Sequence, residues 1–139
     1  MVNGSKKGAA AEADIVKLLS NWAGLEFVRK GRGSSGSDLR VPAGFKWSVE
    51  VKHHKQLKPR HFFFESALLR DFWFQTQKQA REDNRWPLLL VKADGKWFVV
   101  ESMAYAKVAK DISLMTVIGR DNVLVSPLHC FFAKETPLA

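Results

Sequence analysis

Residues 38–53 read DLRVPAGFKWSVEVKH. In the second half of this stretch, apolar and polar side chains alternate, which predicts a β-strand over 45–53 with one face in the core. Because successive side chains point to opposite sides of a strand, Glu50 and Lys52 share the polar side and Val51 lies on the other. We therefore expect this strand to belong to a central sheet, with Glu50 and Lys52 together on one side of it.

Another carboxylate precedes this strand. Asp38 opens a short strand predicted over 38–41, and residues 42–44 turn the chain toward 45–53. Two carboxylates on neighbouring strands suit a hard ion such as Mg²⁺, which binds through one or two carboxylates and keeps several waters. We expect Asp38 and Glu50 to hold Mg²⁺, with Mn²⁺ able to replace it, and Lys52 to act beside the nucleophile. The alternative is a turn-capping aspartate and an ordinary surface pair on the strand.

A third carboxylate belongs to an amphipathic helix predicted over 6–22. Its apolar residues recur at helical spacing, and Gly24 closes the helix. Glu12 borders the apolar face, where a carboxylate is costly unless a partner neutralises it. A metal ion or Lys52 would be such a partner. The alternative is a solvated residue near the positive end of the helix dipole.

The remaining pattern completes an α/β order of αβββαββα followed by a tail. A longer helix is expected over 64–84, and Pro87 marks its end. Asp94-Gly95 predicts a tight hairpin between two strands, because both residues tolerate positive φ. The other expected elements are strands over 25–29, 88–92 and 96–100, a short helix over 102–110, and extended segments over 115–118 and 123–125.

Length and charge limit the class of protein. The 139 residues predict one domain, and the single cysteine, Cys130, excludes a disulfide framework and favours a reducing compartment, the cytoplasm. No signal peptide or membrane-spanning stretch is evident, so we expect no membrane partner. The histidines and Cys130 lack the spacing of a zinc site. A net charge of +8 is typical of proteins that bind polyanions.

Four segments together resemble the PD-(D/E)XK nuclease superfamily, and most of all the small Holliday junction resolvases of archaea and their phage relatives. They are Lys7-Gly8 with Glu12, Ser35-Gly36-Ser37-Asp38, Glu50-Val51-Lys52 and Trp73-Phe74-Gln75. The likeness covers about 6–100, and Ser37 stands where the family motif has its proline. It implies a single nuclease domain over 1–139, with a restriction-endonuclease-like αβββαβ core over about 6–101 and a C-terminal extension over 102–139.

The resemblance also implies roles for individual residues. Glu12, Asp38 and Glu50 would ligate the metal, and Lys52 would be the catalytic lysine. Gln75 matches a glutamine that orders the site in many relatives, although Gln77 and Gln79 compete for this role. No small organic cofactor is expected.

The implied function is a metal-dependent DNA endonuclease that cuts four-way junctions as a homodimer, in the cytoplasm of a prokaryotic cell or one infected by its phage. Two alternatives stay open. The same core could serve a flap, nicking or restriction endonuclease, or the chain could be a DNA-binding module without catalysis.

Basic residues near this motif are either a solvated surface or contacts to DNA phosphates. The residues that we expect to bind DNA are Lys7, Arg29, Lys30, Arg32, Ser34, Ser35, His53, His54, Lys55, Lys58 and Arg60. A second basic stripe, formed by Lys78, Arg81 and Arg85, is as consistent with solubility as with function. Phe62, Phe63 and Phe64 favour the core or a subunit contact, and Trp86 and Trp97 could serve a dimer.

Overall fold

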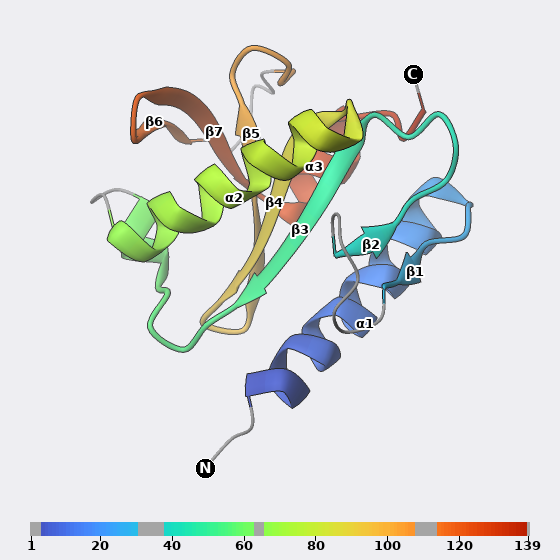
Figure 1. Ribbon diagram of the computed structural model, residues 1–139, viewed down its shortest axis with the longest axis horizontal. Helices are drawn as coiled ribbons and strands as arrows, with labels where there is room; N and C mark the ends of the chain where they lie inside the picture. The colour runs from blue at the N-terminus through green and yellow to red at the C-terminus, as the bar shows by residue number, and fades with distance from the viewer. Residues whose placement is uncertain (1–3, 31–37, 63–65, 108–113, 139) are drawn as a thin grey trace.

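The computed structural model describes residues 4–30, 38–62, 66–107 and 114–138 (Figure 1). Within these ranges the chain forms three α-helices, one 3-10 helix and seven strands. None of the described helices has the length and apolar character needed to cross a membrane. The elements are α1 (Gly4–Ala23), β1 (Val28–Arg29), β2 (Leu39–Arg40), β3 (Trp47–His53), η1 (Pro59–Phe62), α2 (Ala67–Asp83), β4 (Trp86–Ala93), β5 (Lys96–Ser102), β6 (Leu114–Ile118), β7 (Asp121–Pro127) and α3 (Leu128–Lys134).

Five strands form one mixed sheet in the order β3-β4-β5-β7-β6. β3 and β4 are parallel, with Glu50 beside Leu89, and the remaining neighbours are antiparallel. β1 and β2 form a separate two-stranded ribbon. The predicted α/β domain with a central mixed sheet is confirmed. Since β7 lies between β5 and β6, residues beyond 101 complete this same sheet.

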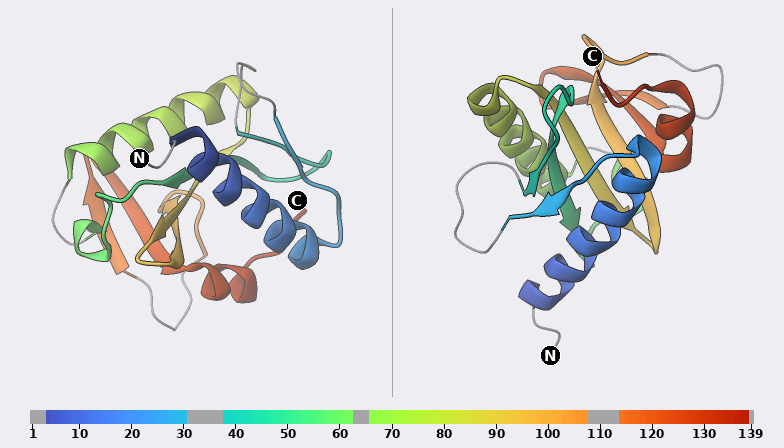
Figure 2. Two further views of the ribbon diagram at one scale, coloured as in Figure 1. Left: turned by 90° about the horizontal axis from the view of Figure 1, so that it is seen from below. Right: turned by 90° about the vertical axis from the view of Figure 1, so that its right-hand side faces the viewer.

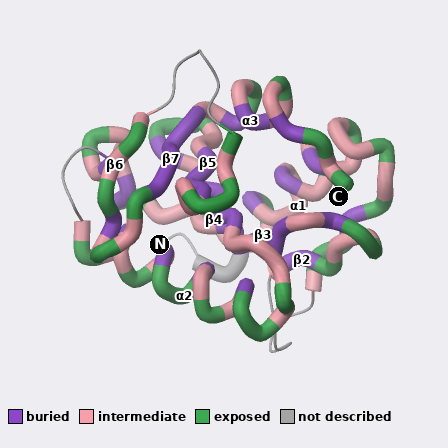
Figure 3. The backbone as a smooth tube through the Cα atoms, turned by 90° about the horizontal axis from the view of Figure 1, so that it is seen from above, coloured by how far each residue is buried: buried purple, intermediate pink, exposed green. Residues whose placement is uncertain are grey.

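The helices cover both faces of the sheet (Figure 2). α1 and α3 pack on the face that carries Val49 and Val51, whereas α2 packs on the opposite face. Figure 3 shows that buried residues concentrate in the central strands, while α2 turns one side to solvent. The buried side of α2 consists of Leu69, Trp73, Thr76 and Ala80. The sheet is therefore a middle layer, and Glu50 belongs to its α2 side.

Local signals explain where α2 begins and ends. The Ser66 hydroxyl accepts a hydrogen bond from the Leu69 N–H at 3.3 Å and so caps the first turn. At the other end, Asn84 adopts a left-handed conformation with φ of 53°, and its N–H bonds back to the last turn. The helix is slightly shorter than the predicted 64–84, of which residues 64 and 65 lie outside the described ranges.

Several expectations for the second half of the chain are confirmed, and two are wrong. The hairpin at Asp94-Gly95 forms, with φ of 51° and 75°, and the two extended segments become β6 and β7. Pro87 does not end the preceding helix but lies inside β4, near its start, where a missing N–H interrupts only the end of the ladder.

The second wrong expectation is the helix over 102–110. Its described part is a turn, in which the N–H groups of Tyr105 and Ala106 both donate to the Ser102 carbonyl. The Lys107 N–H donates to the Glu135 carboxylate instead of to a carbonyl of the same segment. Residues 108–113 lie outside the described ranges. α3, which the sequence pattern did not predict, supplies this carboxylate directly after its last turn.

Candidate metal centre

β3 places the two charged residues of the motif on the α2 side of the sheet. Val49 and Val51 belong to the cluster around α1, so Glu50 and Lys52 point the opposite way. The Glu50 side chain is enclosed there, and the residue is only 2% exposed. A carboxylate buried on a sheet face requires a specific partner.

Asp38 supplies the nearest carboxylate. It lies just before β2, and its carbonyl accepts a hydrogen bond from the Lys30 N–H, which extends the β1–β2 ribbon. Its Oδ2 atom accepts a hydrogen bond from the Val51 N–H at 2.8 Å. The Asp38 carboxylate is therefore fixed against the backbone of β3, one residue from Glu50.

The surroundings of Glu50 favour its protonated form. The pKa of Glu50 is raised from 4.5 to about 8, chiefly by burial. The Asp38 carboxylate, a hydrogen bond to it and the Asp83 carboxylate also raise this pKa, whereas Lys52 lowers it. The Oε2 atom of Glu50 is buried and has no hydrogen-bond partner within the described ranges. Two adjacent carboxyl groups, one of them with a buried oxygen that lacks a partner, form an anionic site that a cation would neutralise.

This donor set fits a hard divalent cation. Mg²⁺ needs only one or two protein carboxylates, because waters and substrate phosphate complete its octahedral shell. Among the described residues, no three His, Cys, Asp or Glu side chains converge closely enough to hold a metal ion without such help. With water and substrate phosphate as further ligands, the adjacent carboxyls of Asp38 and Glu50 could hold one.

Glu12 has a different partner in the structure. Its Oε2 atom lies 3.2 Å from Nε of Arg29, so α1 is joined to β1 by an ion pair. Both residues were predicted to act at the site, Glu12 as a ligand and Arg29 as a DNA contact. In the structure these two residues pair with each other. The role of Glu12 as a metal ligand and that of Arg29 as a DNA contact stay predictions.

Lys52 lies beside an aromatic ring of α2. Its Nζ atom is 5.1 Å from the centroid of Phe72, a distance typical of a cation–π contact. The His54 ring lies 6.5 Å from the same phenyl ring. The side chains of Lys52 and His54 therefore both lie beside Phe72. The Lys52 ammonium remains close enough to Glu50 to lower the pKa of that carboxyl.

A second contact between α2 and β3 was missed by the sequence analysis. The Ser48 hydroxyl donates to Asp83 Oδ2 at 2.7 Å, and Gln79 Nε2 donates to Asp83 Oδ1 at 3.2 Å. Ser48 shares its side of β3 with Glu50 because the two are two residues apart. The spacing of Gln79 and Asp83, one helical turn apart, was the available signal for a polar side of α2.

The three glutamines proposed for the site differ in their contacts. Gln75 is exposed, and Gln77 donates to Asp121 Oδ2 at 2.9 Å, away from β3. Gln79 alone among the three is bonded to a group that contacts β3, namely Asp83. Gln79 is therefore linked to β3 through Asp83 and Ser48, whereas Gln75 is exposed to solvent.

The predicted DNA contacts are only partly described. Lys55 and Arg60 are exposed, and Lys58 forms an ion pair with Asp94 at 3.0 Å. His53 and His54 are partly buried near the end of β3. The side chain of Lys7 is not described, and Arg32, Ser34 and Ser35 lie outside the described ranges.

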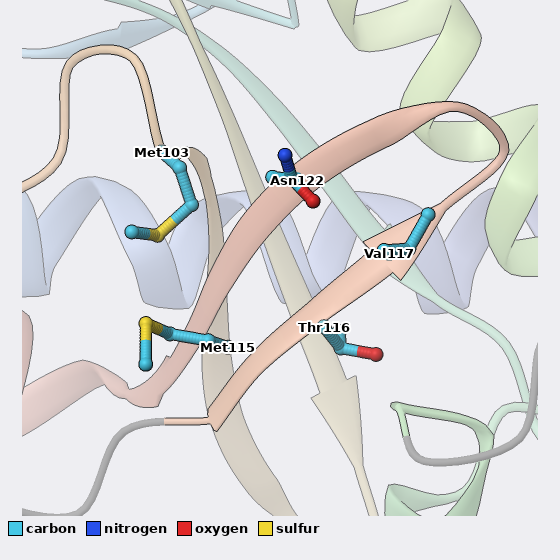
Figure 4. Close-up of a pocket in the computed structure, with 5 residues that line it drawn as sticks. All are labelled: Met103, Met115, Thr116, Val117 and Asn122. Atoms are coloured by element: carbon cyan, nitrogen blue, oxygen red, sulfur yellow. The ribbon is translucent and has the colours of Figure 1, made fainter.

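A separate hollow of about 270 Å³ lies at β6 and β7 (Figure 4). Met103 and Met115 line one side of it, and the other lining residues are Thr116, Val117 and Asn122. None of these side chains is a titratable acid or base, so the described lining of this hollow does not supply the groups that hydrolysis requires. The carboxylates at β3 remain the candidate active site.

Comparison with known proteins identifies a related family. A family model described as "Phage putative PDDEXK endonuclease" matches residues 3–125, which include α1, the β1–β2 ribbon, β3 and α2. The match extends beyond the 6–100 suggested by the motifs and includes most of β7. No curated protein matches the chain.

Proposed function

This chain belongs to the phage PD-(D/E)XK endonuclease family, and from that premise we propose that it is a Mg²⁺-dependent endonuclease that resolves four-way DNA junctions. The family gives a nuclease of the PD-(D/E)XK type, with DNA as substrate and a divalent metal ion as the usual cofactor. The observation that carries the proposed chemistry is the adjacency of the Asp38 and Glu50 carboxyls, with Lys52 beside them.

In this proposal each residue of the site has a separate task. Asp38 and Glu50 would hold the metal ion, and Asp38 is already fixed by the Val51 N–H. When bound, a divalent ion neutralises charge on the phosphate and lowers the pKa of water. Lys52, oriented by Phe72, would stabilise the negative charge that develops on the phosphate oxygens during attack. The net charge of +8 supports binding to the DNA backbone.

A four-way junction requires two symmetric cuts, so we propose that the protein acts as a homodimer. Closed two-fold assemblies are also the commonest oligomers. β6 is at one edge of the five-stranded sheet, and its Met115 and Val117 are 66% and 52% exposed. These apolar side chains support an interface there.

Light scattering at micromolar concentration tests the dimer and should give twice the monomer mass for wild type. A double variant with Met115→Lys and Val117→Lys should give the mass of a monomer. A monomeric wild type would contradict the dimer.

The cytoplasm of a prokaryotic cell, infected by or carrying the phage, is the proposed location. The unpaired thiol of Cys130 supports a reducing compartment.

Cleavage of matched DNA substrates tests the proposed function. Four-way junction, linear duplex, flap and single strand of related sequence are incubated with the protein in Mg²⁺ or in EDTA. Wild type is compared with Asp38→Asn and with Asp94→Asn, which alters an exposed hairpin carboxylate instead. We expect paired symmetric cuts in the junction that disappear in EDTA and in Asp38→Asn but persist in Asp94→Asn.

Other outcomes separate the remaining functions. Equal cleavage of all substrates would retain the nuclease and reject the junction specificity. Binding of the junction without cleavage in Mg²⁺ or Mn²⁺ would reject catalysis and favour the DNA-binding module.

A further inference from the structure

Two aromatic rings stack at the opposite end of β4 from the hairpin. The rings of Trp86 and Tyr105 have centroids 4.9 Å apart and planes inclined by only 7°. Trp86 is the first residue of β4, and Tyr105 belongs to the turn that follows β5, its antiparallel neighbour. Tyr105 is 47% exposed, so the stacked pair ends in an aromatic ring at the protein surface.

The turn after β5 holds Tyr105 in a defined position. The Ser102 carbonyl accepts hydrogen bonds from the N–H groups of Tyr105 at 3.1 Å and Ala106 at 3.0 Å. The Ser102 hydroxyl also accepts from the Ala104 N–H at 3.3 Å. A ring that is already ordered loses little conformational freedom when a planar ligand stacks on it.

Two arginines lie beside this pair. Tyr105 lines a hollow of about 240 Å³ together with Arg81 and Arg85, and within the described ranges no acidic residue lines it. Trp86 lines a second hollow of about 410 Å³ that Arg85, Lys46 and the acidic Asp83 also border. The left-handed turn at Asn84 folds the chain back after α2, and Arg85 Nε donates to the Phe45 carbonyl at 3.2 Å. This contact fixes the direction of the Arg85 guanidinium group.

We propose that Tyr105, Trp86, Arg81 and Arg85, which we call the aromatic platform, bind an unpaired nucleotide of a single DNA strand. The base would stack on Tyr105, and the adjacent phosphates would contact the two arginines. Stacking on an aromatic side chain tolerates every base, and arginines beside it bind the backbone. Arg81 and Arg85 belong to the basic stripe noted in the sequence, so this proposal assigns a ligand to two of its three residues.

The platform is separate from the carboxylates. Trp86 is three residues along β4 from Leu89, the neighbour of Glu50, which corresponds to about 10 Å along the strand. Trp86 also packs on the α1 side of the sheet, whereas Glu50 lies on the α2 side. The inference concerns binding alone, and it therefore stands or falls independently of cleavage.

Binding of a labelled oligothymidylate in EDTA, followed by fluorescence anisotropy, tests this inference. We expect Tyr105→Ala to raise Kd by about 5- to 100-fold, because stacking of one base is lost. Tyr105→Phe retains the ring and should stay within about twofold of wild type. Arg81→Gln should weaken binding and reduce the salt dependence by about one phosphate contact. Phe74→Ala, which removes an exposed aromatic ring of α2 outside the platform, is the control and should bind as wild type does.

Three outcomes would overturn the inference. They are wild-type affinity in Tyr105→Ala, equal loss in Tyr105→Phe and Tyr105→Ala, or an equal loss of affinity for fully paired duplex. Since metal is absent from this assay, a protein that never cleaves DNA but shows the expected pattern would retain the platform and lose only the proposed catalysis.

Discussion

The Asp38 carboxylate accepts a hydrogen bond from the backbone N–H of Val51, 2.8 Å away, and this contact joins the β1–β2 ribbon to the edge of the main sheet. β3 is the outer strand on this side, so one of its N–H groups finds its acceptor in a side chain rather than in another strand. The same contact places Asp38 beside Glu50. The edge of β3 therefore both attaches the β1–β2 ribbon to the main sheet and carries the anionic site.

Asp38→Asn should separate these two roles. Asparagine retains an oxygen that can accept from the Val51 N–H, so thermal stability in EDTA should not fall. The lost charge should weaken metal binding and reduce junction cleavage by at least about 100-fold. Calorimetric titration with Mn²⁺ and a cleavage assay measure both effects. Wild-type cleavage by this variant would remove Asp38 from the metal site.

Glu50→Gln should stabilise the metal-free protein at alkaline pH. Because the pKa of Glu50 is raised to about 8, the folded protein retains a proton that the unfolded chain loses above its usual pKa near 4.5. The free energy of unfolding therefore falls as pH rises through this window, by roughly 1.4 kcal/mol for each pH unit. Glutamine carries no charge and removes this loss.

Urea unfolding in EDTA at pH 5 and pH 8 measures the difference. The advantage of Glu50→Gln over wild type should be small at pH 5 and large at pH 8. Added Mg²⁺ should stabilise wild type at pH 8 and leave the variant unchanged, because only wild type binds the ion. The same stability difference at both pH values would show that Glu50 titrates normally.

Local sequence patterns predicted the elements that hold the site. The helical spacing in α1 is strong because this helix buries one side. The alternation in β3 is equally clear in the sequence, although in the structure the polar side of this strand, with Ser48 and Glu50, is buried as well. α3 escaped prediction because it has only 7 residues and no side-chain cap at Pro127. Its formation depends on tertiary burial of Phe131 against Trp47 and Trp22, which no local pattern reveals.

The residues of the site also fall into two groups, those that local sequence patterns predicted and those whose contacts arise only from tertiary packing. The alternation rule predicted that Glu50 and Lys52 share one side, and the strand order suggested that Asp38 lies next to them. Asp83 could not be predicted, because its contact with Ser48 arises only when α2 packs across β3. A contact between two elements depends on their relative placement, whereas the sequence pattern reports each element alone.

Asp83→Asn should distinguish a neighbouring charge from a metal ligand. Asp83 bonds to Ser48 and raises the pKa of Glu50, but its two oxygens already accept hydrogen bonds. Residues that hydrogen-bond a metal ligand typically change metal affinity by about 10- to 100-fold. Because Asp83 accepts from Ser48 and Gln79 and not from a proposed ligand, we expect the variant to lower Mg²⁺ affinity by less than this and to retain cleavage. Calorimetric titration beside Asp38→Asn provides the comparison. An equal loss in both variants would make Asp83 a ligand.

A buried ionic cluster attaches α3 to the sheet on the side away from the carboxylates. Lys134 Nζ lies 2.6 Å from Glu101 Oε2 and 3.8 Å from Glu135 Oε1, and it donates to the Lys107 carbonyl at 2.7 Å. The side chains of Lys134 and Glu101 are only 7% and 3% exposed. Burial raises the pKa of Glu101 to about 7, although Lys134 opposes this shift. The cluster therefore has two acids for one cation in a region of low polarity.

Lys134→Met should destabilise the protein strongly, and more at pH 8 than at pH 5. Removing the cation leaves Glu101 buried without an opposite charge, which costs about 3–5 kcal/mol. At pH 5 the raised pKa of Glu101 allows this carboxyl to be protonated at little cost, so much of the loss should be recovered.

Lys58→Met, which breaks the exposed pair with Asp94, is the matched control and should change stability by no more than about 1 kcal/mol. Urea unfolding of both variants at the two pH values measures the effect, and an equal loss for Lys134→Met at pH 5 and pH 8 would mean that Glu101 is not the group left uncompensated.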